Sequence, residues 1–258
     1  MYVIILSCCL AFVMYVLYYN VSDGNVEQSS FNEELTVLNL EFENNVENSV
    51  DTVCGNDCDA KIHGDVIFIP GVHGKAIKFH NNTDGWISIP HNENLNFNDD
   101  DGITLSFWVM ANTHELRHNM IYNKGNVGWG VTYTNSINGL YEGDVKKFQA
   151  LWTGNNNQYL NLLCYDDEQI QLGEWYFITH VLENDRQTLR QYINGKEYCN
   201  AISTSKIYFD NTDDFHLGRV IGTYEDKSDL MLDNFYLFAY SLSREQVYDL
   251  YHYELSKK

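Results

Sequence analysis

The stretch Ile103-Thr104-Leu105-Ser106-Phe107-Trp108-Val109 decides the fold class, because Ile, Leu, Phe and Val alternate along it with Thr, Ser and Trp. A period of two places every second side chain on the same face of an extended strand. The residues that share the apolar face are Ile103, Leu105, Phe107 and Val109. This pattern predicts a β-strand with one face in a hydrophobic core.

Similar short runs recur on both sides of this stretch. Strand candidates begin near Val37 and continue at 77–79, 86–89, 120–122, 128–133, 148–152, 159–164, 175–182, 188–193, 215–217 and 230–236. Asn194-Gly195 follows one of them, and both residues tolerate a positive φ, which predicts a two-residue hairpin turn. Many short strands separated by turns favour an all-β antiparallel sandwich over alternating strands and helices.

One helix is predicted near the C-terminal end of the chain. Ser243 is a good N-cap, and Gln246 three residues later completes a capping box. Leu242 and Val247 flank the cap and can form a hydrophobic staple. The sequence therefore predicts a short helix over about residues 244–253.

The N-terminal segment is apolar. Tyr2 to Tyr19 contains no charged residue. Its length is near the ~20 residues of a transmembrane helix and above the ~7–15 residues of a signal-peptide core. We therefore predict a hydrophobic helix in residues 1–20, either a signal anchor or a cleaved signal peptide, followed by a polar, acidic stalk at 21–35 and one domain at 36–254.

The net charge restricts the partners. The 258-residue chain has 36 Asp plus Glu against 16 Lys plus Arg, for a formal charge of -20. The electrostatic field of such a negative charge repels phosphate backbones, so nucleic acid is not expected as a partner. Solubility alone would also account for the acidic excess. The many Asn, Tyr and Asp residues are typical of AT-rich genomes, which makes a viral envelope one candidate location.

The cysteines favour an oxidising compartment. Two, Cys8 and Cys9, lie in the apolar segment, and the other four are Cys54, Cys58, Cys164 and Cys199. Four cysteines allow three pairings. We favour Cys54–Cys58 and Cys164–Cys199 outside the cytosol, with zinc bound by Cys54, Cys58 and His63 or His73 as the alternative.

A secreted or membrane-anchored domain facing outside would also expose its glycosylation sequons. Asn81-Asn82-Thr83 is such a sequon. We therefore predict that Asn81 is glycosylated.

The pattern H-E-x-x-H occurs at His114-Glu115-Leu116-Arg117-His118. In zinc proteases this motif lies on a helix, so that both histidines bind one metal and the Glu activates its water. Here it lies between two predicted strands, and no G-x-x-H follows it. We interpret it as a chance match and do not expect an enzyme.

Five segments stand in a fixed order along the chain. They are Gly74-Lys75-Ala76-Ile77-Lys78-Phe79 with Asp84-Gly85-Trp86-Ile87-Ser88-Ile89-Pro90; Leu95-Asn96-Phe97 with residues 103–109; Gly173-Glu174-Trp175-Tyr176-Phe177-Ile178; Gln191-Tyr192-Ile193-Asn194-Gly195; and Leu232-Asp233-Asn234-Phe235-Tyr236-Leu237-Phe238-Ala239-Tyr240-Ser241-Leu242-Ser243. In this order they resemble the laminin-G-like jelly-roll superfamily, which includes pentraxins and concanavalin A-like lectins. The resemblance covers about residues 37–252 and implies a two-sheet jelly-roll sandwich.

The resemblance also implies a calcium site at the edge of the sandwich. The matching positions are Asp51 and Asp233, and the loop after Asp51 is rich in oxygen ligands. This sequence departs from the family's pattern at two places. It has Thr52-Val53-Cys54 in place of small residues, and Asn234 in place of a second Asp. The alternative is a solvated acidic loop with one structural Asp.

Glucanases of this fold use E-x-D-x-x-E on one strand, which places two catalytic carboxylates on the same face. The nearest match, Glu183-Asn184-Asp185-Arg186-Gln187, lacks the second acid. A glycoside hydrolase or lyase is therefore the alternative to a binding module.

Lectins of this class stack a sugar on an aromatic ring and bind its hydroxyls with polar side chains. Trp152 and Asn156 are the candidates here, with Trp129, Tyr133 and Tyr159 nearby, although strand aromatics more often lie in the core. We predict an extracytoplasmic module, linked to a membrane through residues 2–19, that recognises a glycan or an extracellular or envelope protein. The alternative without a small ligand is a structural envelope or adhesion protein.

Overall fold

The computed structural model describes residues 36–50, 54–80, 84–95, 97, 102–112, 118–124, 129–134, 147–153, 159–163, 171–207, 212–219 and 228–257. The apolar segment at 2–19 and the predicted stalk lie outside these residues. Within the described part of the chain, no helix is both long and apolar enough to cross a membrane.

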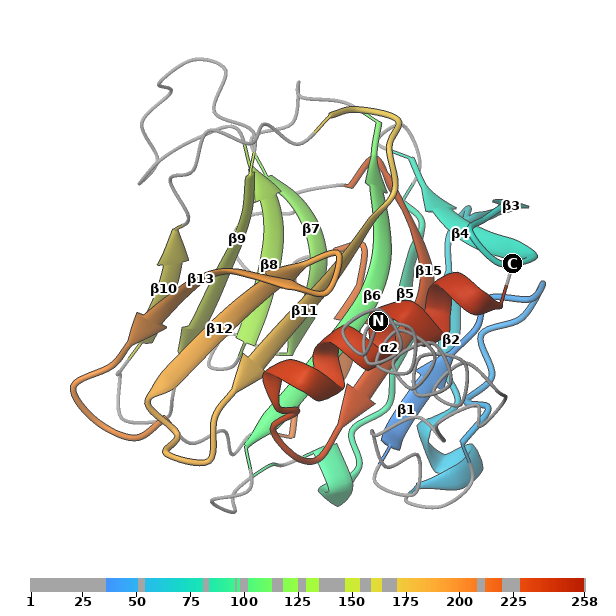
Figure 1. Cartoon of the computed structure of the whole chain (residues 1–258). Coiled ribbons are helices and arrows are strands. Elements are labelled where there is room, and N and C mark those ends of the chain that lie inside the picture. The colour runs from blue at the N-terminus through green and yellow to red at the C-terminus, as the bar shows by residue number, and fades with distance from the viewer. Residues whose placement is uncertain are drawn as a thin grey trace, which may run out of the picture.

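The described residues form two antiparallel sheets (Figure 1). Sheet A has the order β13-β12-β11-β6-β15-β4-β3, and β1 also pairs with β15. Its strands are β1 (Thr36–Leu40), β3 (Ile67–Pro70), β4 (Lys75–Phe79), β6 (Ile103–Ala111), β11 (Tyr176–Leu182), β12 (Thr188–Ile193), β13 (Lys196–Ile202) and β15 (Leu230–Phe238).

Sheet B has the order β10-β9-β8-β7-β14-β5-β2. Its strands are β2 (Lys61–His63), β5 (Trp86–Ile89), β7 (His118–Lys124), β8 (Trp129–Thr134), β9 (Lys147–Thr153), β10 (Tyr159–Leu163) and β14 (Phe215–Leu217). Two short 3-10 turns, Gly55–Cys58 and Glu93–Leu95, lie between strands. The predicted all-β, antiparallel two-sheet sandwich is confirmed.

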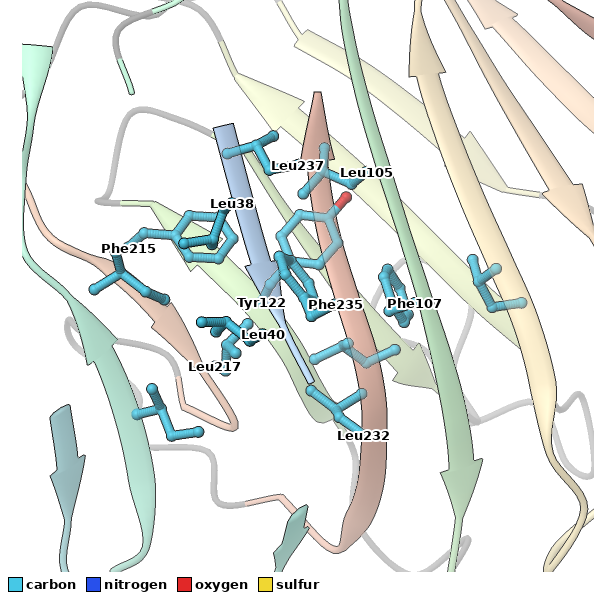
Figure 2. Packing of buried hydrophobic residues seen from close by; sticks show 14 of the residues in the cluster. Leu38, Leu40, Leu105, Phe107, Tyr122, Phe215, Leu217, Leu232, Phe235 and Leu237 are labelled. Atoms are coloured by element: carbon cyan, nitrogen blue, oxygen red, sulfur yellow. The ribbon is translucent and has the colours of Figure 1, made fainter. Parts of the chain in front are cut away.

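The space between the sheets is filled by the apolar side chains that alternation predicted. Phe107 of β6 stacks on Phe235 of β15 at 5.6 Å between ring centroids. Tyr122 of sheet B meets the Phe107 ring edge to face at 5.8 Å, which joins the two layers. Figure 2 shows these rings packed with leucines from both sheets. Such aromatic burial contributes roughly 2–3 kcal/mol per side chain.

The outer face of sheet A is covered by α2 (Arg244–Ser256), which lies across β11, β6 and β15 (Figure 1). Trp108, Phe177 and Tyr236 on this face form a second core with Val247 and Leu250 of the helix. This is why the residues of β6 that alternate with the main core are also buried.

The predicted capping box of α2 is present. The Ser243 side chain accepts from the backbone N–H of Gln246, and the Gln246 side chain accepts from the backbone N–H of Ser243. The helix runs to Ser256, three residues beyond the predicted end. In this last turn the Glu254 carboxylate is buried and accepts from Trp108 Nε1 at 3.1 Å and from Tyr236 OH at 2.8 Å, so tertiary contacts extend the helix.

The Asn194-Gly195 turn joins β12 to β13, with φ of 50° and 75° at the two residues. It confirms the predicted two-residue hairpin. The ranges of β2, β3 and β13 were not predicted, because all three are edge strands whose residues are mostly exposed or half-buried.

Candidate functional site

The outer face of sheet B is where side chains that avoid the core come together. Ile87 and Ile89 of β5 and Phe215 and Leu217 of β14 point into the main core. Alternation therefore places Trp86, Ser88 and His216 on the opposite face of the sheet. The helix α2 packs on sheet A and leaves this face uncovered by any described helix (Figure 1).

A group of aromatic and cationic side chains, the Trp86 cluster, lies at one side of this face. It consists of His63, Trp86, His216 and Arg219. His63 and Trp86 are directly opposite across β2 and β5, and their rings stack at 3.9 Å and 9°. The His216 ring lies 5.0 Å from the indole, and Arg219 Cζ lies 5.3 Å from its centroid. These neighbours hold a half-buried indole in one orientation.

A row of polar side chains, the polar row, runs beside the cluster from strand to strand. Ser88 of β5 pairs with His216 of β14, which pairs with Asn123 of β7. Ser88 Oγ lies 2.8 Å from His63 Nε2, so this side chain links the row to the Trp86 cluster. Residues in register on adjacent strands share one face, so the three side chains are immediate neighbours.

His216 is 4% exposed. Burial lowers its pKa to about 4, although Asp213 and Asp214 act in the opposite direction. The imidazole is therefore neutral at pH 7. His216 Nδ1 and Asn123 Oδ1 are both buried without a hydrogen-bond partner. An aromatic ring beside uncharged polar groups with unused hydrogen-bonding capacity is suited to binding a polyhydroxylated ligand.

Trp152 does not lie on an exposed surface. It is fully buried in the main core, as is Ala150 two residues earlier, because these are the inward positions of β9. The prediction that its ring is a sugar platform is corrected: Trp152 is a core residue. Asn156 lies outside the described residues, so its predicted role stays a prediction. Sequence reasoning missed Trp86, although its alternation with Ile87 and Ile89 marked it as outward-facing.

Asp233 is a buried residue of β15 that fixes the turn between β3 and β4. Its Oδ2 accepts from the backbone N–H groups of Val72 at 2.7 Å and His73 at 3.0 Å. Burial, with a smaller contribution from the Glu254 charge, raises its pKa to about 7.

Asp233 Oδ1 is buried without a hydrogen-bond partner. This oxygen would suit a cation. The described residues, however, contain no group of three or more His, Cys, Asp or Glu side chains arranged for a metal. The other predicted ligand, Asp51, lies outside them, and calcium stays a prediction.

The predicted Cys54–Cys58 disulfide is present, with 5.7 Å between the Cα atoms. It leaves neither thiol available for zinc. Cys199 is also disulfide-bonded, and its predicted partner Cys164 lies outside the described residues. The sequon residue Asn81 lies outside them as well.

Residues 114–117 of the H-E-x-x-H motif lie outside the described residues. His118 begins strand β7, whereas the zinc-protease signature needs a helix. Glu183 forms an ion pair with Arg190. Asp185 accepts from the backbone N–H groups of Gln187 and Thr188 and caps the turn between β11 and β12.

A hollow lies between the β11–β12 end of sheet A and the start of α2. Its charged groups are mutually neutralised. Arg190 binds Glu183 and Glu197, and Arg244 binds Glu197.

Residues 81–248 match the family described as the concanavalin A-like lectin/glucanases superfamily. The chain belongs to this superfamily. The resemblance noted from the five sequence segments is thereby confirmed.

One curated relative is botulinum neurotoxin type X of Clostridium botulinum, which is 25% identical over 225 residues, 86% of this chain and 16% of the toxin. The binding domain of Paraclostridial Mosquitocidal Protein 1 is similar in structure, with a TM-score of 0.69, 18% identity, and coverage of 85% of this chain and 52% of that one. This chain thus spans about half of such a toxin binding domain and a small part of the whole toxin.

Domain 4 of AbnA, an extracellular arabinanase of Geobacillus stearothermophilus solved with arabinotriose, has a TM-score of 0.61 at 16% identity, and the match covers 83% of this chain and 97% of that domain. The binding domain of botulinum neurotoxin DC was solved with rat synaptotagmin II and with SialylT, at TM-scores of 0.65 and 0.63 and 17% identity. Each of those two matches covers 86% of this chain and 52% of the toxin domain. The toxin structures among them are binding domains rather than catalytic domains, in agreement with the expectation of a non-enzymatic binding module.

Proposed function

We propose that this chain is an extracytoplasmic glycan-binding module and that the outer face of sheet B holds the ligand. One observation carries the proposal: the half-buried Trp86 indole lies beside a row of neutral polar side chains that keep unused hydrogen-bonding capacity. The complete AbnA domain, which was solved with arabinotriose, supports a sugar as the class of ligand.

The geometry suggests how a sugar would bind. The C–H face of a pyranose or furanose ring packs against the exposed part of the indole, while its hydroxyls meet the polar row. The ring of Trp86 is held by His63, and the strands behind it are fixed by the main core. A rigid site of this kind loses little side-chain entropy on binding.

The first test is the substitution Trp86→Ala. The purified full-length chain is titrated calorimetrically with arabinotriose, cellotriose, maltotriose and SialylT. We expect the wild type to bind at least one of them and Trp86→Ala to weaken that binding at least ~10-fold, equivalent to about 1.4 kcal/mol.

Tyr248→Ala is the matched control, because Tyr248 is an aromatic residue of α2 that is 54% exposed on the other side of the molecule. It should bind as the wild type does. Equal binding by wild type and Trp86→Ala, or no binding of any sugar by the wild type, would contradict the proposal.

A protein receptor is the second candidate function, because the botulinum neurotoxin DC binding domain was solved with synaptotagmin II. An extracellular or envelope protein bound with the same affinity by wild type and Trp86→Ala would favour this alternative.

Export and membrane linkage are also part of the proposal. They rest on the apolar segment at 2–19 and are supported by disulfides, which persist in oxidising compartments. Extraction of expressing cells with alkaline carbonate tests this: an anchored chain stays with the membrane fraction, a secreted chain appears in the medium, and a soluble intracellular chain would refute export.

Calcium binding through Asp51 and Asp233 is proposed as a feature of the same module. A ligand that binds only the native state raises the melting temperature. An unchanged melting temperature between EDTA and millimolar calcium would remove the metal from the account.

A further inference from the structure

We propose that two copies of this chain pair along strand β3 and form a symmetric dimer, in which the outer faces of both copies of sheet B point the same way. The observations that carry the dimer lie at the edge of sheet A and are independent of sugar binding. Only the use of the two faces for bivalent binding rests on the proposed glycan-binding function.

Strand β3 is an edge strand without charged residues. It pairs with β4 and ends the strand order of sheet A (Figure 1). Its sequence is Ile67-Phe68-Ile69-Pro70, whereas the edge strands β2 and β13 both contain lysine. Folded proteins usually protect a free edge with charges, bulges or cover, because an apolar edge recruits another strand. The composition of β3 therefore indicates an edge that another strand covers.

The apolar side chains at this edge are only partly covered by the described residues. Ile67 is 51% exposed, and Phe68 and Ile69 are half-buried. Ile62 of β2, the strand that ends sheet B, is 40% exposed. Residues 64–66 join β2 to β3, so the two strands lie at the same side of the sandwich. This side therefore offers apolar surface in both layers, and the burial of such surface drives association.

The partner that fits this edge is a second copy of the same strand. Ile67 and Ile69 flank Phe68, so these three residues read the same in both directions. In antiparallel pairing about a two-fold axis at Phe68, Ile67 of each copy is opposite Ile69 of the other, and the two Phe68 side chains are direct partners. All the cross-strand pairs are then apolar.

Other registers of the same pairing fit less well. A shift of the partner strand by one residue would place core-facing side chains opposite outward-facing ones. An axis at Ile67 or Ile69 would bring a residue outside β3, or Pro70 without its N–H, into the ladder. The axis at Phe68 is therefore the register that we expect.

The symmetry of this pairing sets the direction of the binding faces. A two-fold axis between antiparallel edge strands is perpendicular to the sheet, so both copies of sheet A continue into one sheet with the same face on each side. The outer faces of both copies of sheet B, with their Trp86 clusters, then point to one side. Two sites that face one surface can bind it together, which raises the effective affinity without new contacts.

The formal charge of -20 opposes the dimer, because the two copies repel each other. Salt screens exposed charges beyond about 8 Å at physiological ionic strength, but it does not weaken apolar contacts. We therefore expect the association to tighten as the sodium chloride concentration rises.

The first test measures the oligomeric state of the full-length chain in detergent micelles by sedimentation equilibrium, without sugar. We expect a reversible monomer–dimer equilibrium. Its dissociation constant should rise at least ~10-fold in Ile67→Lys, because a lysine at a free edge opposes strand pairing. Ile202→Lys is the matched control: Ile202 is 74% exposed on β13, the other edge strand of sheet A, and its substitution should leave the association unchanged.

A second variant tests the register and does not depend on the folding of Ile67→Lys. Phe68→Cys places one thiol of each copy beside the two-fold axis, so mild oxidation should join two copies into a covalent dimer. Tyr248→Cys, at an exposed position of α2, should give no more covalent dimer than the wild type. Thermal melting of each variant checks that the fold is retained.

Bivalent binding is tested on a surface coated with the trisaccharide that binds most tightly in solution. The wild type should bind this surface at least ~10-fold more tightly than Ile67→Lys, whereas both should bind the free sugar equally in calorimetry. Equal binding of the two proteins to the coated surface would overturn the bivalent use of the dimer.

The remaining outcomes separate the dimer from the proposed function. A wild type that stays monomeric up to ~100 µM would overturn the inference and leave the proposed function standing. A dimer that persists unchanged in Ile67→Lys, or a Phe68→Cys variant that forms no covalent dimer, would overturn pairing through β3. A wild type that forms the β3 dimer but binds no sugar would support the dimer and refute the proposed function.

Discussion

Buried polar side chains of this domain fall into two groups at the scale of single residues. Glu254 is fully buried, and its carboxylate accepts hydrogen bonds from Trp108, Asn234 and Tyr236. These bonds satisfy the carboxylate and fasten α2 to sheet A. His216 Nδ1 and Asn123 Oδ1 are instead buried without a hydrogen-bond partner. The first arrangement stabilises the fold, and the second leaves hydrogen-bonding capacity unused.

His180 gives the clearest pH dependence. It is fully buried, with Nε2 3.0 Å from Gln191 Oε1, and burial lowers its pKa from 6.5 to about 4. The unfolded chain therefore takes up a proton on this residue below pH 6.5, whereas the folded chain does not until about pH 4. The stability that a neutral His180 contributes is present above pH 6.5 and is lost as the pH falls, by roughly 3 kcal/mol in total.

We expect His180→Gln to lose less stability than the wild type between pH 7 and pH 4.5 in urea unfolding. His216 has the same sign and Asp233, with its raised pKa, the opposite one, but both stay in the variant and cancel in the comparison. Parallel profiles for wild type and His180→Gln would refute this prediction.

At the scale of elements, local sequence patterns predicted where the strands and the helix lie, but they did not predict what surrounds each element. The alternation in β6 and the capping box of α2 were visible in the sequence, because both arise from neighbouring residues. Alternation could not say which face of β9 points inward. Ala150 and Trp152 lie on the same face of β9. The pairing of β9 with β8 and β10 turns that face toward the core.

The candidate face was harder to predict for the same reason. His63, Trp86, His216 and Asn123 are separated by up to 153 residues (216 minus 63) and become neighbours only through the order of sheet B. The alternation within each strand could have identified the outward-facing residues of that strand alone. Nothing local indicates that β14 lies between β5 and β7.

The α2 cap gives a prediction at this scale. Ser243→Ala removes the acceptor of the Gln246 N–H, at 3.2 Å, and should cost about 1 kcal/mol of unfolding free energy. Ser256→Ala at the other end of the helix, where the hydroxyl is exposed, should cost less than about 0.5 kcal/mol. Equal losses in chemical denaturation would show that the capping box is unimportant.

At the scale of the whole molecule, the two outer faces of the sandwich differ. Sheet A is covered by α2 and a second core, and the hollow beside the helix has paired charges. The outer face of sheet B has no described helix over it, and it carries the Trp86 cluster and the polar row. The covered face stabilises the fold, and the open face is the one we propose for recognition.

Hydrogen–deuterium exchange of the full-length chain with and without the tightest-binding neutral trisaccharide tests this claim most directly. Our account predicts slower exchange in peptides that contain 61–63, 86–89, 118–124 and 215–217, all in sheet B. Peptides from 183–192 and 241–246, which border the hollow beside α2, should exchange at unchanged rates. Protection confined to that hollow, with sheet B unaffected, would contradict the account.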